Sequence, residues 1–296
     1  MVRSYAAKGR KKRRKRKLEE VVEDDEEEVV EEEEEAGREE EGNGGEVEKE
    51  VEEEEEGRRR RKAHEDDDDE VPGLPVVARP VVDGGRKRPG VIFVLEKASL
   101  EVGKVGKNLQ MLNSDDHANF LRKQNRNPAD YRPDIIHQAL LAIFDSPLTK
   151  AGRLQAVYVK TERGVLFEIK PHVRMPRTFK RFCGLMSQLL QKLSITAAGK
   201  REKLLNVIKN PVTRYLPVDS RKIGLSYSAE KSVNLFDYVA GASDDVSLVF
   251  IVGAMAHGMI DKENTDDFIS ICSYPLSAAC CLNRICGALE QKWKIG

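Results

Sequence analysis

A run of small residues in the last third of the chain could bring a ligand against the main chain. Residues 253–258 read Gly-Ala-Met-Ala-His-Gly and directly follow the apolar run at residues 246–252. Small side chains at the end of a strand leave backbone N–H and C=O groups open to a ligand. The run lacks the Gly-Lys-Ser/Thr ending of a phosphate loop and the G-x-G-x-x-G spacing of a dinucleotide turn. The alternative interpretation is a plain tight turn.

A second segment could form another wall of the same pocket. Residues 271–279 read Ile-Cys-Ser-Tyr-Pro-Leu-Ser-Ala-Ala, so that an expected strand runs into Tyr274-Pro275 and then into a helix. Pro275 breaks the strand, and Ser277 can cap the helix. Alone this segment could be structural punctuation, but beside residues 253–258 it predicts a pocket.

Cations gather where a helix is expected to begin at Thr178, namely at Arg174, Arg177, Lys180 and Arg181. Cations at a helix N-terminus oppose the helix dipole, so helix stability does not explain their position. Arginines beside free N–H groups suit phosphate oxygens, which favours nucleic-acid binding. A solvated basic face is the alternative.

The run Arg132-Pro133-Asp134 opens another expected helix. Proline suits the first helical turn. Asp134 is favourable near the helix N-terminus and can hold the neighbouring Arg132. A simple helix start is the alternative interpretation.

These candidates need elements that position them. Continuous apolar runs at residues 91–95 and 246–252 are typical of strands buried on both faces. Strands separated by helices predict a mostly parallel α/β sheet, in which ligands bind beyond the carboxyl ends of the strands. Other strands are expected at residues 154–159, 165–169, 222–227 and 268–273, and helices at 133–144, 179–193, 233–239 and 276–293.

The remaining segments give weaker expectations. The polar residues 101–132 predict a long loop or short helical pieces. The strands at 154–159 and 165–169 flank a turn signal and predict a hairpin. Helical spacing predicts two inward-facing sets: Phe179, Phe182, Met186, Leu189, Leu190 and Leu193 in one helix, and Ala278, Ala279, Leu282, Ile285, Cys286 and Leu289 in the last one.

Charge divides the chain into two opposed segments. Residues 1–90 carry 21 Lys/Arg and 31 Asp/Glu, net −10, whereas the rest carry 29 and 20, net +9. The basic run 10–17 predicts a nuclear or nucleolar address, with a polyanion-binding tail as the alternative. Residues 19–56 hold 24 acidic residues and too little apolar material to fold. We therefore expect a disordered basic and acidic arm with a linker over residues 1–88, and a domain over 89–296.

Several classes of protein are disfavoured. No apolar run approaches the ~20 residues of a membrane-spanning helix, and the N-terminus lacks the apolar segment of a secretory signal. The five cysteines have no C-x-x-C spacing, which indicates reduced thiols in place of disulfides or a zinc site. No metal is expected.

Taken together, the motifs resemble one known family. They are, in chain order, the runs at residues 132–138, 144–155, 173–182, 252–258 and 273–278. The set is similar to the essential small-subunit ribosomal RNA pseudouridine-N1 methyltransferases of the SPOUT superfamily, over about residues 90–296. The N-terminal arm resembles the long acidic extensions of some plant members.

The resemblance implies an α/β, SPOUT-type sheet with a C-terminal trefoil knot, a homodimer and S-adenosylmethionine as the methyl donor. It implies methylation of a pseudouridine N1 in small-subunit rRNA, and action with pre-ribosomal proteins in small-subunit biogenesis in the nucleolus. Cofactor contacts would fall on Leu225, Gly253, Gly258, Ile271, Cys272, Ser273, Tyr274, Pro275 and Leu276. RNA contacts would fall on Arg132, Asp134, Arg174, Arg177 and Arg181.

No sequence feature identifies a catalytic proton acceptor. Asp134 is near the right place by the resemblance, but orienting Arg132 is its more direct role. Two rival functions stay open. An RNA-binding assembly factor without essential catalysis need not keep an intact 253–258 run, and a generic small-molecule α/β enzyme predicts no affinity for RNA.

The acidic arm is expected to be dispensable for folding of the rest. Because it has no apolar face to bury, removal of residues 1–85 should leave the melting temperature of the remaining chain nearly unchanged. Thermal unfolding followed by circular dichroism measures this, and a large drop on truncation would show that the arm packs.

Overall fold

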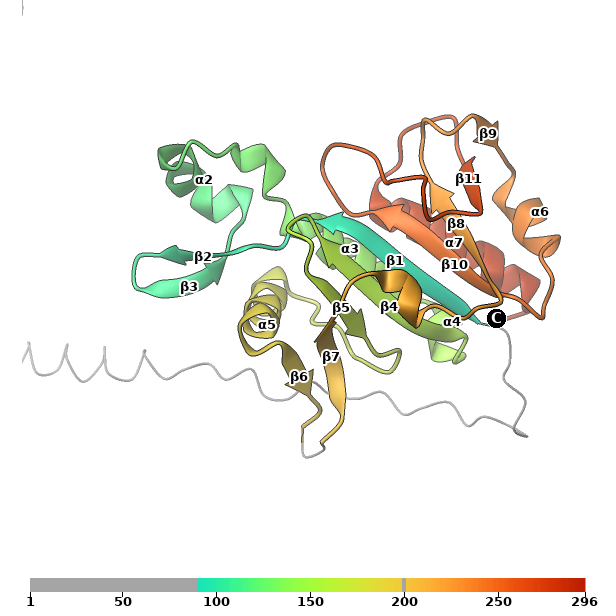
Figure 1. The fold of residues 1–296 in the computed structure, drawn as a ribbon, viewed down its shortest axis with the longest axis horizontal. Helices are drawn as coiled ribbons and strands as arrows, with labels where there is room; N and C mark the ends of the chain where they lie inside the picture. The colour runs from blue at the N-terminus through green and yellow to red at the C-terminus, as the bar shows by residue number, and fades with distance from the viewer. Residues whose placement is uncertain (1–89, 199–200, 296) are drawn as a thin grey trace, which may run out of the picture. The chain divides into compact units, whose positions relative to one another are not determined.

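A single mixed sheet organises the part of the chain that the computed structural model describes, residues 90–198 and 201–295. Nine of its strands within those residues run in the order β6-β7-β5-β4-β1-β10-β8-β11-β9 (Figure 1). The strands of this sheet are β1 (Val91–Ala98), β4 (Leu154–Thr161), β5 (Leu166–Ile169), β6 (Ser194–Thr196), β7 (Lys203–Ile208), β8 (Ser220–Leu225), β9 (Lys231–Ser232), β10 (Ser247–Gly253) and β11 (Asp267–Ser270). The predicted arm over residues 1–88 lies outside the described residues, and the domain boundary at 89 stays a prediction.

Helices connect these strands. They are α2 (Ser114–Lys123), η1 (Pro128–Asp130), α3 (Pro133–Phe144), α4 (Pro147–Lys150), α5 (Phe179–Lys192), η2 (Val212–Tyr215), α6 (Leu235–Ala240) and α7 (Ala278–Lys292). The strands β4, β1, β10, β8, β11 and β9 pair in parallel, whereas β4, β5, β7 and β6 pair antiparallel. The predicted α/β class is therefore confirmed, with an antiparallel extension on one side.

Strand β1 shows why the central apolar runs are continuous. Successive side chains of a strand point to opposite faces of the sheet. Val91, Phe93 and Leu95 pack into the larger core cluster, while Ile92 and Val94 belong to the cluster on the other face. Because both faces are covered, every position from 91 to 95 is apolar and buried, as the sequence predicts.

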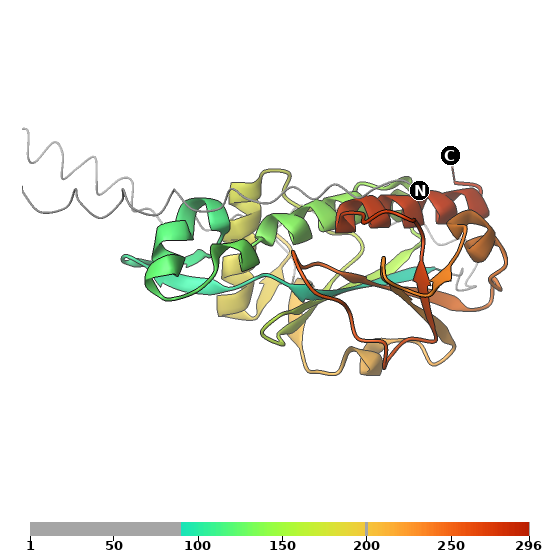
Figure 2. The ribbon, with the colours of Figure 1, turned by 90° about the horizontal axis from the view of Figure 1, so that it is seen from above.

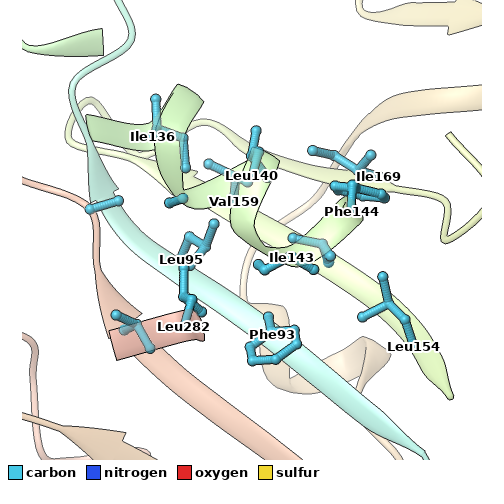
Figure 3. Packing of buried hydrophobic residues seen from close by; sticks show 14 of the residues in the cluster. Phe93, Leu95, Ile136, Leu140, Ile143, Phe144, Leu154, Val159, Ile169 and Leu282 are labelled. Atoms are coloured by element: carbon cyan, nitrogen blue, oxygen red, sulfur yellow. The ribbon is translucent and has the colours of Figure 1, made fainter. Parts of the chain in front are cut away.

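Three helices, α3, α5 and α7, lie along one face of the sheet (Figure 2). The apolar side chains of all three helices belong to the larger core cluster. Figure 3 shows Leu140 of α3 and Leu282 of α7 on the same side of β1 as Leu95. The opposite face carries a smaller cluster, against which Val212 and Leu216 of the η2 segment pack. Each helix buries one apolar stripe, as the 3.6-residue helical period predicts.

The predicted hairpin is confirmed, since β4 and β5 pair antiparallel with Val157 opposite Ile169. Some expectations are wrong. Leu193 is 56% exposed because it ends α5 in the left-handed conformation, with φ 61°. Ala278 and Ala279 are only half-buried, because they border a cavity described below. Strands β6 and β7 were not anticipated at all.

Residues 101–132 contain the predicted short helical pieces, α2 and η1, together with two strands that were not predicted. The strands β2 (Val102–Val105) and β3 (Asn108–Met111) form a separate hairpin. Gly106 turns it with φ +64°, a conformation that suits glycine. Asn113 then caps α2, accepting a hydrogen bond from the Asp116 N–H at 2.7 Å. The hairpin was not predicted because it contains residues of low strand propensity, such as Lys104 and Asn108.

A charged cluster fastens the β9 edge of the sheet. The Asp267 carboxylate of β11 accepts hydrogen bonds from Arg221 of β8, from Lys231 of β9 and, at 2.6 Å, from the Tyr238 hydroxyl of α6. These donors hold the pKa of Asp267 well below its usual range, and burial raises the pKa of Tyr238. Four elements are thus joined through one ionised side chain.

The helices in the described part of the chain are too short or too polar to cross a membrane. The trefoil knot implied by the resemblance stays a prediction, since strand pairing alone does not define how the chain threads.

Candidate functional site

A cavity of about 870 Å³ opens at the carboxyl ends of β8, β10 and β11. Because β8 lies between β10 and β11, the chain leaving β10 crosses the end of β8 before it enters β11. Three loops therefore converge there, at residues 225–228, 252–260 and 269–272. Ligand cavities of about 300–1,000 Å³ are typical of small-molecule sites, and this edge of the sheet is where the sequence predicts one.

The 253–258 run lines this cavity from one side. Gly253 is the last residue of β10, and Gly258 sits in the loop with φ +109°. The conformational requirement for glycine thus falls on Gly258, because an L side chain rarely adopts that φ. At Gly253, an added Cβ would lie 2.8 Å from Met255 Cε, so the Met255 side chain would have to shift.

The 271–279 segment lines the cavity from another side, as predicted. Of the expected cofactor residues, Leu225, Gly253, Gly258, Ile271, Cys272, Tyr274 and Leu276 border the cavity, whereas Ser273 and Pro275 are not among its lining residues. Ser277 caps α7, accepting from the Cys280 N–H at 3.2 Å. The expected strand to Ser273 is too long: β11 ends at Ser270, whose hydroxyl donates to the Cys272 carbonyl at 2.9 Å and turns the chain.

The start of α3 borders the same cavity. Arg132 donates from Nε to Asp134 Oδ1 at 2.8 Å and from a terminal guanidinium nitrogen to Oδ2 at 2.7 Å, a bidentate ion pair. The hydrogen bonds from Arg132 lower the pKa of Asp134, and the same bonds raise the pKa of Arg132. Asp134 is therefore an ionised carboxylate that fixes the direction of a cation, which makes it a poor proton acceptor.

The basic segment is exposed and lies outside the cavity lining. Arg174, Arg177, Lys180 and Arg181 are all exposed, and Arg177 pairs with Asp145 at 3.1 Å. Thr178 occupies the cap position of α5 but makes no capping hydrogen bond with its side chain. The exposure suits contact with a large anion more than with a small enclosed one.

Helix α3 connects the basic segment to the cavity. His137, one turn after Asp134, hydrogen-bonds the Pro176 carbonyl at 2.8 Å and stacks on Phe182, with ring centroids 4.5 Å apart. Burial raises the pKa of Cys183 to about 11, and the charges of Asp116 and Asp134 add to the rise. One helix thus holds the Arg132–Asp134 pair and anchors the arginine segment.

Sequence reasoning missed several cavity residues. Ser114, Gln138, Ser226, Tyr227, Met259 and Cys281 also line the cavity. Gln138 lies one turn beyond Asp134 on the same helix, which is a signal that the helical spacing offered. Ser114 carried no such signal, because it comes from the separate β2–β3 and α2 region. Within the described residues, no group of three His, Cys, Asp or Glu side chains could hold a metal ion.

A mostly parallel α/β sheet with a cavity of small-ligand size at its carboxyl edge defines an α/β protein of the small-molecule-binding class. Residues 93–290 match the family model described as EMG1/NEP1 methyltransferase. The chain belongs to that family.

Known relatives agree with this assignment. The chain is 50% identical over 212 residues to the ribosomal RNA small subunit methyltransferase NEP1 of Mus musculus, which covers 72% of this chain and 84% of the relative. Its identity to the protein of that name from Homo sapiens is 48% over 219 residues, 73% of this chain and 88% of the relative. The crystal structure of Archaeoglobus fulgidus Nep1 bound to S-adenosylhomocysteine shares the fold, with a TM-score of 0.58 at 22% identity, over 69% of this chain and 99% of that one.

The Arg132–Asp134 pair predicts a measurable pH dependence. Because the pKa of Asp134 is lowered in the folded chain, the pair stabilises the fold at pH values above the ordinary aspartate pKa of 3.8. That contribution is lost as the pH falls through the lowered value. The free energy of unfolding should exceed that of Asp134→Asn by about 1 kcal/mol or less at neutral pH, since both side chains are partly exposed. The difference should shrink below about pH 4.

Urea unfolding of both proteins between pH 3 and pH 7 measures this difference. The Asn variant is the reference for the unaltered chain, because its residue 134 does not titrate. A difference that stays constant across the whole range would contradict the assigned pair.

Proposed function

We propose that this chain transfers a methyl group from S-adenosylmethionine to the N1 nitrogen of a pseudouridine in small-subunit ribosomal RNA. The observation that carries the proposal is the shared helix α3, whose first turns join a small-ligand cavity to an exposed arginine segment. The names of the relatives, and the S-adenosylhomocysteine bound to the fold neighbour, support the same reaction.

The cavity fits a nucleoside cofactor with a charged sulfonium side chain. Its wall combines apolar side chains, such as Leu225 and Val252, with loop backbone at residues 253–258 and 271–272. Apolar walls with a few polar groups are what small-molecule sites use to bind and orient a ligand. When bound, the cofactor would supply an electrophilic methyl group, whose carbon an in-line nucleophile attacks while S-adenosylhomocysteine leaves.

The acceptor base would enter beside the start of α3. Arg132, Gln138 and Ser114 border that end of the cavity and offer hydrogen-bond donors to a base edge. Held by Asp134, the Arg132 guanidinium presents a fixed positive charge. A fixed cation favours the anionic form of an imide-like nitrogen, so Arg132 would help N1 lose its proton.

No residue of the described chain is as clear a candidate for a general base as Arg132 is for stabilising the N1 anion. Asp134 is held ionised by Arg132, so its affinity for a proton is reduced. Its role in this proposal is to orient Arg132, and most of the rate would come from placing the nitrogen in line with the methyl group.

The arginine segment would hold the RNA backbone while one base reaches the cavity. Exposed arginines bind phosphate oxygens without reading sequence. A base in A-form duplex hides its edges, so the target must lie in a loop or another unpaired region. His137 and Asp134 fix how far the phosphate contacts lie from the acceptor site.

A direct experiment tests this reaction. The chain is mixed with methyl-labelled S-adenosylmethionine and three RNA hairpins that carry pseudouridine, uridine or N1-methylpseudouridine at one loop position. Label should enter the pseudouridine hairpin alone, because uridine has a glycosidic bond at N1 and the third hairpin is already methylated. Equal labelling of all three would contradict the proposal.

The second candidate is an RNA-binding assembly factor in which catalysis is secondary. The exposed arginines favour RNA binding under either function. A preserved cavity with a positive-φ glycine favours the enzyme, since a scaffold has no need of it. The hairpin assay separates the two.

The wider setting belongs to the same proposal. A homodimer, contacts with pre-ribosomal small-subunit proteins and a nuclear or nucleolar location are expected from the resemblance and from the basic run at residues 10–17. Small-subunit biogenesis is the process in which such an enzyme would meet its rRNA.

The cofactor site should depend on Gly258. Gly258→Ala places a side chain at φ +109°, which strains the loop that lines the cavity. We expect binding of S-adenosylhomocysteine to weaken by at least about tenfold, the scale of 1–2 kcal/mol of strain. Gly253→Val should also abolish binding, because its branched side chain would force Met255, which lines the cavity, to shift. Calorimetric titration measures both affinities.

Gly164→Ala is the matched control. Gly164 has φ +81° with nothing within 4 Å of its added Cβ, and it lies in the turn before β5, away from the cavity. It should lose stability but keep its affinity for the cofactor. Wild-type affinity in Gly258→Ala and in a folded Gly253→Val would remove the cofactor from this loop.

RNA binding should depend on the arginine segment. Changing Arg174, Arg177 and Arg181 together to Ala removes up to three phosphate contacts, each worth about one unit in the salt dependence of log K. Affinity should fall for all RNA sequences and the slope against log salt should flatten, while S-adenosylhomocysteine still binds.

A control variant carries the same change in net charge elsewhere. Three exposed cations serve here: Lys203 on β7, Lys209 in the loop that follows it and Arg214 on η2. Their joint replacement by Ala should reduce the slope less than the arginine variant does. Filter binding over a range of salt concentrations measures both, and equal effects would place the RNA elsewhere.

A further inference from the structure

Lys97 has an unusual backbone conformation at the end of the central strand. Its φ is +56°, in the left-handed region that residues with a side chain rarely adopt. The pairing of β1 with β4 shifts register there, between Leu95 and Ala98. Irregularities of this kind re-aim a side chain, and backbone strain of this kind concentrates at functional sites.

The Lys97 side chain reaches the loop that lines the cavity. Its Nζ donates a hydrogen bond to the Met259 carbonyl at 2.5 Å and lies 3.9 Å from Asp261 Oδ1. The neighbouring Glu96 holds the start of the same loop, where its carbonyl accepts a hydrogen bond from the Ala254 N–H at 2.8 Å. The end of β1 therefore holds the loop at both of its ends.

The held loop includes the residues that matter for the cavity. Residues 255–260 all line it, and they include Gly258 with its φ of +109°. On the other side, the Ser228 hydroxyl donates to Met259 Sδ at 3.1 Å. Met259 thus connects the end of β1 to the loop after β8, directly over the cavity.

We propose that Lys97 is a positioning residue for the cofactor: by holding the Met259 carbonyl, its ammonium fixes the 254–261 loop in the conformation that binds the methyl donor. The inference rests on the proposed function for the identity of the ligand. Glycine would tolerate this backbone conformation at no steric cost, so a lysine with φ +56° is accounted for by what its side chain holds.

The test variant is Lys97→Gly. Glycine accepts the left-handed conformation, so the variant removes the ammonium without straining the strand end. The dissociation constant for S-adenosylhomocysteine, measured by titration calorimetry, should rise roughly tenfold, the scale of one charged hydrogen bond. Amide hydrogen exchange at residues 255–260 should speed up, and affinity for an RNA hairpin should stay unchanged.

Two further variants separate positioning from stability. Asn125→Gly is the matched control, because Asn125 also has φ +56° and does not line the cofactor cavity. It should leave both the cofactor affinity and the exchange of the loop unchanged. Lys97→Arg keeps a cationic donor and should restore most of the affinity lost in Lys97→Gly.

The outcomes are distinct. Wild-type affinity and wild-type exchange at residues 255–260 in Lys97→Gly would overturn the inference. A fall in melting temperature that accompanies faster exchange throughout the sheet would also overturn it, since that would be a structural role. If the unaltered chain fails to bind S-adenosylhomocysteine, the proposed function fails, while exchange at residues 255–260 still decides whether Lys97 holds the loop.

Discussion

Parallel pairing of β10 with β1 on one side and β8 on the other is the constraint on which the rest of the structure depends. It buries β10 on both faces and brings the carboxyl ends of β1, β10, β8 and β11 to one edge. Because β8 lies between β10 and β11, the loops that leave these strands must meet. The cavity follows from this order, and its walls come from segments far apart in the sequence.

Helix α3 gives this edge its chemical character. The helix is anchored by an apolar stripe against Phe93 and Leu95, so its N-terminus is fixed relative to the sheet. The Arg132–Asp134 pair at that end borders the cavity, and His137 ties the arginine segment to the same helix. In the proposed function, the cation beside the acceptor end would position the base, and the cations on the outer surface would bind phosphates. One element sets the distance between them.

Much of this arrangement could be predicted from the sequence, and the failures have physical causes. Apolar runs such as residues 91–95 correctly predicted buried strands, because a strand that is covered on both faces has no polar positions. The β2–β3 hairpin escaped prediction, since it stands apart from the main sheet and its residues are polar and exposed. Leu193 fits the helical spacing, but the chain leaves the helix at that residue and turns the side chain outward.

The sequence by itself determined the α/β class, the central strands and the four chemical segments, because periodicity, small-residue runs and clustered charge are local properties of a chain. Only the tertiary structure decided which segments share one cavity. It joined residues 253–258, residues 271–279 and the Arg132–Asp134 pair, and it left the arginine segment outside. It also showed that Gly258 has the positive φ that requires glycine, and that Lys97 donates a hydrogen bond to the Met259 carbonyl. Those facts depend on strand order and on contacts such as that between Lys97 and Met259, 162 positions apart, which no local pattern encodes.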